Sequence, residues 1–177
     1  MKISENLTEQ LIRMGRQWII RQRNQHAPRG SPLPGKALES LAPFFSTETL
    51  ESVRIVQVAT IENPAFYGTM LTSRLPRLID FRKASGITFI DTILLSDGVI
   101  GGSPPLSLLF HEIVHVVQYR LLGVDEFARR YVLGWMESGY RYEAIPLEKQ
   151  AFGLTARFIE EKRDFSVDLE VEKTMPS

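Results

Sequence analysis

Two histidines and a glutamate, His111, Glu112 and His115, lie close together in an apolar stretch of the chain. In a helix each residue turns by about 100°, so the two imidazoles would project roughly 40° apart, one turn from each other. The glutamate would lie at the edge of the same face. Two imidazoles so arranged can bind one tetrahedral metal ion, and a carboxylate beside them can reach a water on the open side of the ion. The spacing therefore predicts a metal centre with Glu112 as proton acceptor.

The helix that must carry these residues is predicted from Ser103 to Leu122. Ser103 is followed by two prolines, which is typical of a helix start, and Gly123 is typical of a helix end. The residues between them are apolar nearly all round, which indicates a buried helix. A buried carboxylate without a partner costs several kcal/mol, and a cation held by neutral imidazoles offsets that cost. The alternative is that the three polar residues are hydrogen-bonded core residues that share a helix by chance.

A third metal ligand must come from elsewhere, because catalytic zinc usually takes three protein ligands and leaves one position for water. The chain has no cysteine, which excludes thiolate ligands, disulfides and a cysteine nucleophile. The remaining histidine, His26, lies in the polar approach to a proline-rich segment and is expected at the surface. The candidates are therefore the carboxylates of Glu137, Glu143 and Glu148. An ion pair with Arg130 accounts for Glu137, and Glu143 is the main alternative to Glu148.

Glu148 is favoured because of its place in a predicted helix, which begins at Pro146 and runs to about residue 162. It heads a stripe that we expect to face the core, made of Ala151, Phe152, Thr155 and Ile159. A carboxylate on an apolar stripe again requires a cation. The alternative is a first-turn glutamate that complements the helix dipole, which contributes about 0.3 to 1 kcal/mol on an exposed surface.

The segments that carry these residues resemble gluzincin-type zinc metallopeptidases, in which a second helix supplies a glutamate ligand. Residues 111–118, HEIVHVVQ, and residues 145–151, IPLEKQA, are more narrowly similar to bacterial metallopeptidase-like domains of largely unknown substrate. The similarity extends over about residues 41–158, but only these two motifs are specific. It implies an α+β fold of a minimal zincin-like type, in which a small β-sheet packs on the HExxH helix and on further C-terminal helices.

The resemblance also implies the roles of individual residues. His111, His115 and Glu148 would bind one zinc ion. Glu112 would act as general base in the hydrolysis of peptide bonds, with a peptide or protein as the substrate. The chain departs from the family pattern at residues 150–151, Gln and Ala, where related sequences often place another acid. The groups that orient the zinc-binding histidines are therefore not predicted.

The residues leave two other functions open. The chain could be a zinc-binding interaction module of weak catalytic activity, which acts through a basic first helix and a long loop. It could also be a metal hydrolase of non-peptide amides or esters. A peptidase needs a donor to the developing oxyanion, for which Tyr140, Arg141 and Tyr142 are candidates beside ordinary packing roles. Gln118 and Tyr119 either line the pocket or pack in the core.

The elements that must position these residues are predicted from their patterns. Strands are expected at residues 53–61, 87–90 and 92–95, and helices at residues 6–23, 36–41, 103–122, 125–138 and 146–162. Residues 63–86 form a long irregular connection, of a kind that often walls a binding site. The strand at 92–95 either presents an edge to an extended peptide or is an ordinary core strand. We expect an N-terminal amphipathic helix and proline-rich linker at residues 1–35, a metallopeptidase-like domain at residues 36–162 and a flexible tail at residues 163–177.

Composition excludes some classes of partner. The 177 residues are 44% hydrophobic, which suits one compact domain. Lys and Arg together number 21, as do Asp and Glu, so no overall charge favours nucleic acid or an anionic membrane. No stretch approaches the roughly 18 apolar residues of a membrane span, and residues 1–25 lack the apolar core of a signal peptide. A cytoplasmic protein without stable membrane insertion is the expectation, and neither cleavage specificity nor oligomeric state is predicted.

Overall fold

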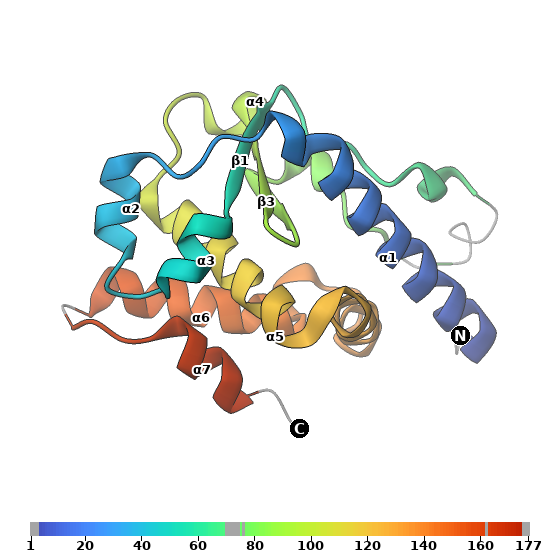
Figure 1. The fold of residues 1–177 in the computed structure, drawn as a ribbon. Helices are drawn as coiled ribbons and strands as arrows, with labels where there is room; N and C mark the ends of the chain where they lie inside the picture. The colour runs from blue at the N-terminus through green and yellow to red at the C-terminus, as the bar shows by residue number, and fades with distance from the viewer. Residues whose placement is uncertain (1–3, 70–74, 76, 162, 175–177) are drawn as a thin grey trace.

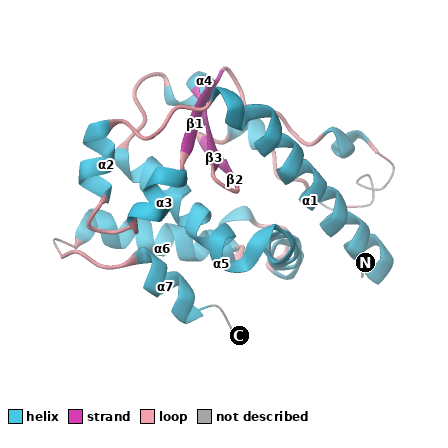
Figure 2. Cartoon of the chain, in the orientation of Figure 1, coloured by secondary structure: helices cyan, strands magenta, loops and turns pink. Residues whose placement is uncertain are grey.

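The computed structural model describes residues 4–69, 75, 77–161 and 163–174, and its fold is α+β (Figures 1 and 2). The helices are α1 (Glu5–His26), α2 (Gly35–Leu41), α3 (Thr47–Ser52), α4 (Asp97–Ile100), α5 (Leu106–Glu137), α6 (Pro146–Glu160) and α7 (Val167–Thr174). The strands are β1 (Arg54–Val58), β2 (Gly86–Phe89) and β3 (Thr92–Ser96). Short 3-10 helices lie at Ala27–Arg29, Ala65–Gly68, Phe81–Lys83 and Tyr142–Ala144.

A small sheet lies at the centre of the fold, with its described strands in the order β1-β3-β2. β3 runs parallel to β1 and antiparallel to β2, and every residue of β3 is buried. β3 carries apolar residues on both of its faces. This fits a central strand, because both faces of such a strand are covered by other elements. Of the two roles left open for this strand, the exposed edge is therefore wrong, and β3 is a core strand. The outer strands are β1 and β2.

α5 carries the predicted metal-binding histidines, and it bends at one glycine. It begins after Pro105 and ends at Glu137, but Gly123 has φ 72° and ψ 164°, outside the helical region. The predicted helix end at Gly123 is confirmed as a break between two halves of a longer element. Residues 109–119 of the first half are all buried. Even so, no helix in the described part of the chain combines the length and apolar character that a membrane crossing requires.

Alternate residues of β3 pack into two core clusters, one on each face of the sheet. Ile93 and Leu95 pack with the first half of α5 and with residues of α2, α3, α6 and α7. Leu94 points the other way, into a cluster with Ile19 of α1 and Trp135 of the second half of α5. Side chains on a strand alternate between its faces, so β3 ties both clusters together. The sheet is thereby fixed against the first half of α5.

α1 packs on the sheet and on α5 (Figure 1). Ile19 is buried, and the Trp18 ring lies edge-on to the Phe89 ring of β2, with their centroids 4.9 Å apart. Arg23 donates two hydrogen bonds to Asp91 in the turn between β2 and β3, at 3.0 and 2.7 Å. The amphipathic helix predicted for this part of the chain therefore buries its apolar face and supports strand β2.

The C-terminal segment contains a helix where the sequence predicted a flexible tail at residues 163–177, of which residues 175–177 lie outside the described part. In α7, Val167 and Val171 are fully buried. The Val167 amide also donates to the Phe44 carbonyl oxygen at 2.8 Å. Two helical turns offer only one such apolar pair, which is too short a signal for periodicity to reveal. The tertiary contacts of this segment therefore determine that it forms a helix.

The connection between β1 and β2 is irregular, as predicted for residues 63–86, although residues 70–74 and 76 lie outside the described part of the chain. The Asn63 side chain donates to the Asp80 carboxylate at 2.9 Å. This hydrogen bond joins the start of the segment to a residue near its end.

Replacing Val171 with Ala should lower the free energy of unfolding by about 2 kcal/mol, because two buried carbon atoms are lost and a cavity remains. Leu169 lies on the same helix but is 57% exposed. Leu169→Ala should therefore change the free energy by less than about 0.5 kcal/mol. Urea unfolding followed by circular dichroism measures both changes. Equal effects of the two substitutions would contradict the docking of α7.

Candidate metal centre

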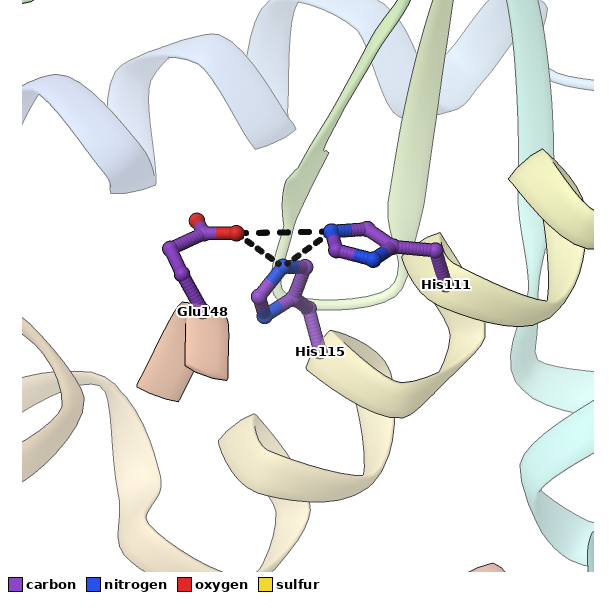
Figure 3. Close-up of side chains that lie close together, drawn as sticks. All are labelled: His111, His115 and Glu148. Atoms are coloured by element: carbon purple, nitrogen blue, oxygen red, sulfur yellow. Dashed lines mark hydrogen bonds and ion pairs between the residues drawn. The ribbon is translucent and has the colours of Figure 1, made fainter. Parts of the chain in front are cut away.

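Three side chains from two helices bring one donor atom each to a common point (Figure 3). His111 and His115 lie one turn apart on the first half of α5, and Glu148 lies in the first turn of α6. The Nε2 atoms of His111 and His115 are 3.2 Å apart. The Glu148 Oε2 atom lies 3.3 Å from His111 Nε2 and 3.4 Å from His115 Nε2. All three residues are buried.

These separations fit a shared metal ion. With metal–ligand bonds of about 2.0 to 2.1 Å, two ligands of a tetrahedral ion lie about 3.3 to 3.4 Å apart. The Glu148 Oε2 atom is buried, accepts no hydrogen bond from the described residues and faces the two imidazoles. A buried carboxylate needs a positive charge beside it, which either a metal ion or a proton on an imidazole can supply. Two imidazole nitrogens and one carboxylate oxygen are common ligands of divalent transition metals, so these residues could hold one ion.

The start of α6 is fixed by close packing on the second half of α5. Pro146 is the first residue of α6, where the missing amide leaves no hydrogen bond unmade. A Cβ atom on Gly134 would lie 2.6 Å from the Pro146 Cδ atom, so glycine lets the two helices approach. Ile145 and Leu147 are buried on either side of the proline. Glu148 is thereby held opposite the two histidines.

Gln118 orients His115. The Gln118 side-chain oxygen accepts from His115 Nδ1 at 2.8 Å, and its side-chain nitrogen donates to the Leu147 carbonyl oxygen at 3.0 Å and to Gln150 Oε1 at 2.8 Å. A backbone carbonyl oxygen only accepts, which fixes the orientation of the Gln118 amide and puts the imidazole proton on Nδ1. In the neutral form of His115 the lone pair of Nε2 therefore faces His111 and Glu148. Gln150 takes part by holding Gln118.

Tyr131, in the second half of α5, orients Glu148. Its hydroxyl donates to Glu148 Oε1 at 2.8 Å, which leaves Oε2 for the metal position. Burial, and then the Glu148 charge, raise the pKa of Tyr131 well above its ordinary value. The same two causes raise the pKa values of Tyr119 and Tyr142. All three hydroxyls therefore stay protonated at neutral pH and remain hydrogen-bond donors.

Glu112 lies beside the histidines and is held by strand β2. Its Oε2 atom accepts from the Thr88 hydroxyl at 2.7 Å, and the residue is only 4% exposed. A Cβ atom on Gly86 would lie 2.7 Å from Glu112 Oε1, so glycine makes room for the carboxylate. Burial raises the pKa of the Glu112 carboxyl, although the neighbouring histidines oppose the shift. A carboxylate with a raised pKa is a stronger base than one in water.

In the protein without metal, His115 and Glu148 stabilise each other's charges. Burial disfavours the protonated form of His115, but the Glu148 carboxylate outweighs burial and raises the pKa of His115 to about 9. Burial also disfavours the Glu148 carboxylate, but His115 and His111 hold the pKa of Glu148 well below its ordinary value. A metal ion must therefore displace a proton from His115 when it binds.

The other ligand candidates lie outside this group. Glu137 and Glu143 are exposed, and Glu143 belongs to the 3-10 helix that precedes α6. His26 was expected at the surface, but it is 7% exposed. Arg29, in the 3-10 helix after α1, places a guanidinium nitrogen 2.6 Å from His26 Nδ1. Burial and the Arg29 charge lower the pKa of His26, as expected for a neutral histidine away from any carboxylate partner.

The candidate metal centre lines a cleft of about 790 Å³. The cleft is bordered by α1, by the connection between β1 and β2, by strand β2 and by α6. Of the three residues considered as oxyanion donors, Tyr140 and Tyr142 line the cleft. Tyr140 packs edge-on against Trp135, with ring centroids 4.9 Å apart, and Arg141 donates to the Ser138 carbonyl oxygen at 3.2 Å. Burial, and then the Glu148 charge, raise the pKa of Tyr142.

The stripe on α6 differs from its prediction. Ala151 is buried in the core as expected, but Phe152 is 44% exposed and Ile159 is 65% exposed. Both line the cleft together with Thr155. At about 100° per residue, Ala151 projects roughly 60° to one side of Glu148, whereas the other three lie within roughly 40° of it. The stripe therefore divides into a row that faces the core and a row that faces the cleft.

Thr88, Gly86 and Tyr131 contribute to the site, and the sequence singled out none of them for it. Thr88 is 24 residues away from Glu112 along the chain, and its contact depends on how the sheet docks on α5. Tyr131 has the spacing of an ordinary core residue on its helix, so periodicity could not distinguish it. Gly86 precedes a predicted strand, where a glycine is the one available signal of a close approach.

Glu148→Ala should weaken the binding of Zn²⁺ by roughly a hundredfold or more, because it removes one of the three donor atoms. Glu143→Ala is the matched control, since Glu143 is exposed and lies five residues earlier in the sequence. Competition with a chromophoric chelator measures both affinities. A larger loss for Glu143→Ala than for Glu148→Ala would mean that the ligand set is assigned incorrectly.

The affinity for Zn²⁺ should rise between about pH 6.5 and 9, because binding displaces the proton that Glu148 holds on His115. The pKa of His115 is raised, so its contribution to the stability of the metal-free protein is full below about pH 6.5 and lost as the pH rises through about 9. The Tm of the metal-free protein should fall over this range, while the increase in Tm on adding Zn²⁺ grows. Thermal unfolding with a chelator and with buffered Zn²⁺ measures the two trends. In Glu148→Gln the fall of the metal-free Tm should disappear, and its persistence would argue against this charge pair.

Comparison of the chain with descriptions of known protein families, with curated proteins and with solved structures gave no match. The chemistry open to this site therefore follows from its own geometry. That geometry consists of a buried group of two imidazoles and one carboxylate, which could hold a metal ion, with a second carboxylate beside it.

Proposed function

We propose that this chain is a zinc-dependent metallopeptidase of a minimal zincin-like type, which hydrolyses peptide bonds with Glu112 as general base. One observation carries the proposal. His111 Nε2, His115 Nε2 and Glu148 Oε2 form a triangle with sides of 3.2, 3.3 and 3.4 Å beside the Glu112 carboxylate. Hydrolytic zinc sites need such a combination of three protein ligands and an adjacent base.

Zinc is the metal that this donor set supports best. Two imidazoles with one carboxylate are a known ligand set of hydrolytic zinc sites, which keep one coordination position open. The cleft gives access to such a position, because all three ligand residues line it. When bound, zinc supplies a Lewis acid that acidifies water and polarises a carbonyl group.

Glu112 carries the proton transfers of the proposed reaction. Its carboxylate takes a proton from the attacking water as the water oxygen bonds to the scissile carbonyl carbon. Glu112 then gives this proton to the departing nitrogen, so that the C–N bond breaks and a carboxyl group and an amine are released. Thr88 occupies Oε2 of Glu112, which leaves Oε1 for the water. The raised pKa of Glu112 supports this role, because a base works best when its pKa lies near the working pH.

Tyr142 is the donor that we favour for the developing oxyanion. It lines the cleft, and burial and the Glu148 charge raise its pKa, so its hydroxyl carries a proton at neutral pH. The Arg141 side chain donates to the Ser138 carbonyl oxygen and the Tyr140 ring packs on Trp135, whereas the Tyr142 hydroxyl interacts with Glu148 beside the two histidines. A donor held in place before the reaction stabilises charge that appears only in the transition state.

An extended peptide is the substrate class that the surroundings support. Strand β2 borders the cleft along Gly86–Phe89, and among the described strands it is paired on one side only. An extended peptide can add to such an edge through main-chain hydrogen bonds. A peptide bound there would run past Glu112, which contacts Gly86 and Thr88 of this strand. A small amide or ester lacks the row of main-chain groups that would pair with such an edge.

Glu112→Gln should lower kcat for peptide hydrolysis by roughly 10²- to 10⁴-fold, because the amide cannot accept the proton from water. The zinc content should stay the same, since Glu112 is not one of the proposed ligands. A fluorogenic peptide library and elemental analysis measure the two properties. Glu137→Gln is the control, because Glu137 is an exposed glutamate on the same helix.

The possible outcomes separate the three functions. Zinc-loaded Glu112→Gln protein that cleaves peptides at the parent rate would exclude Glu112 as the base. Stoichiometric zinc in a parent protein that cleaves no peptide of the library would favour the interaction module. Cleavage of esters or non-peptide amides alone would favour the metal hydrolase of small substrates.

A further inference from the structure

One face of α6 leaves apolar side chains exposed next to the metal centre. Phe152 is 44% exposed and Ile159 is 65% exposed. Thr155 lies between them, and its hydroxyl donates to the Ala151 carbonyl oxygen at 2.8 Å, so this donor is already used. We call Phe152, Thr155 and Ile159 the α6 stripe. Apolar surface in water is unfavourable, and contact with an apolar ligand would remove it from water.

Packing in the core does not explain the apolar residues of the α6 stripe. The row of α6 that packs in the first core cluster consists of Ala151, Leu154 and Phe158. This row alone would dock the helix. α6 therefore carries a second row in which Phe152 and Ile159 stay partly exposed, and this row lies in a cleft.

The α6 stripe is continuous with the metal centre. Phe152 follows Glu148 by one helical turn, and its ring centroid lies 4.6 Å from that of His111. Glu148 and the whole stripe line the same cleft. A helix rises about 1.5 Å per residue, so the stripe reaches about 16 Å from Glu148 to Ile159. An extended chain covers this length with about five residues.

We propose that the α6 stripe binds substrate side chains on one side of the scissile bond, and that the substrate is an extended polypeptide segment rich in large apolar residues. This proposal rests on the proposed peptidase function, because it assumes that the scissile carbonyl lies at the metal centre. Folded proteins bury such segments. The accessible substrates are therefore unfolded or partly unfolded chains and short apolar peptides.

The chemistry of the α6 stripe favours this occupant. The stripe has no charged residue, so a Lys or Asp side chain of a substrate would lose water there without gaining a partner. The stripe also forms a wall of a cleft that contains the buried ligands of the metal centre. An extended peptide can enter a cleft, whereas a membrane surface or a folded second copy contacts protruding surfaces.

Zinc-loaded Glu112→Gln protein tests binding separately from hydrolysis. The probes are two fluorescein-labelled decapeptides, one of alternating Leu and Thr and one of alternating Lys and Thr. Fluorescence anisotropy should show tighter binding of the Leu peptide. Adding Ile159→Asp should weaken that binding about tenfold, because one apolar contact is lost and a charge is left beside the ligand. The same change should strengthen binding of the Lys peptide.

Leu169→Asp is the matched control, because Leu169 is a similarly exposed apolar residue, 57% exposed, on α7. Equal binding of the Leu peptide by the two variants would overturn the proposal. So would an effect of Ile159→Asp that is limited to self-association in sedimentation velocity, or to binding of phospholipid vesicles.

The two proposals can fail separately. If the parent protein cleaves peptides and Ile159→Asp leaves kcat/KM for the Leu peptide unchanged, the α6 stripe is not a substrate site and the peptidase function stands. If peptide binding depends on Ile159 and no peptide is cleaved, the binding surface stands and the peptidase function fails.

Discussion

A carboxylate oxygen that faces two imidazoles inside the protein is the constraint around which this structure is arranged. Glu148 is 2% exposed, so its charge must be neutralised locally. In the metal-free protein a proton on His115 provides the opposite charge, and a divalent cation at the same point would replace that proton. Tyr131 and Gln118 leave only Oε2 and the imidazole Nε2 facing this point. The groups around this point thus favour a positive charge there.

The proposed metal ligands and the proposed base are positioned by different parts of the fold. The ligands depend on the contact between α5 and α6, where Gly134 lets Pro146 approach closely. Glu112 depends on strand β2, through the Thr88 hydroxyl and the space above Gly86. α1 supports β2 from the other face, through Trp18 and through the ion pair at the β2–β3 turn. Disturbing the sheet should therefore displace Glu112 before it displaces the two histidines and Glu148.

Sequence patterns predicted the elements whose signals are local. The strands near residues 54–58, 86–89 and 92–96, the long helix with a break at Gly123, and the helix that starts at Pro146 all follow from periodicity and from proline and glycine positions. Features that depend on contacts between distant residues could not be predicted from local sequence patterns. The short helix α7, the central place of β3 and the exposure of the α6 stripe each depend on what packs against them.

For the site, the sequence by itself determined the placement of His111, Glu112 and His115, because the helical repeat fixes how residues one and four apart project. It could only rank several carboxylates as the third donor. Tertiary structure brought Glu148 to the histidines and left Glu143 exposed. It also decided which hydrogen bonds orient each donor, because such bonds join residues that no local pattern relates. The regular repeat of a helix fixes how neighbouring residues on it project. The complete site also depends on how the helices and the sheet pack together.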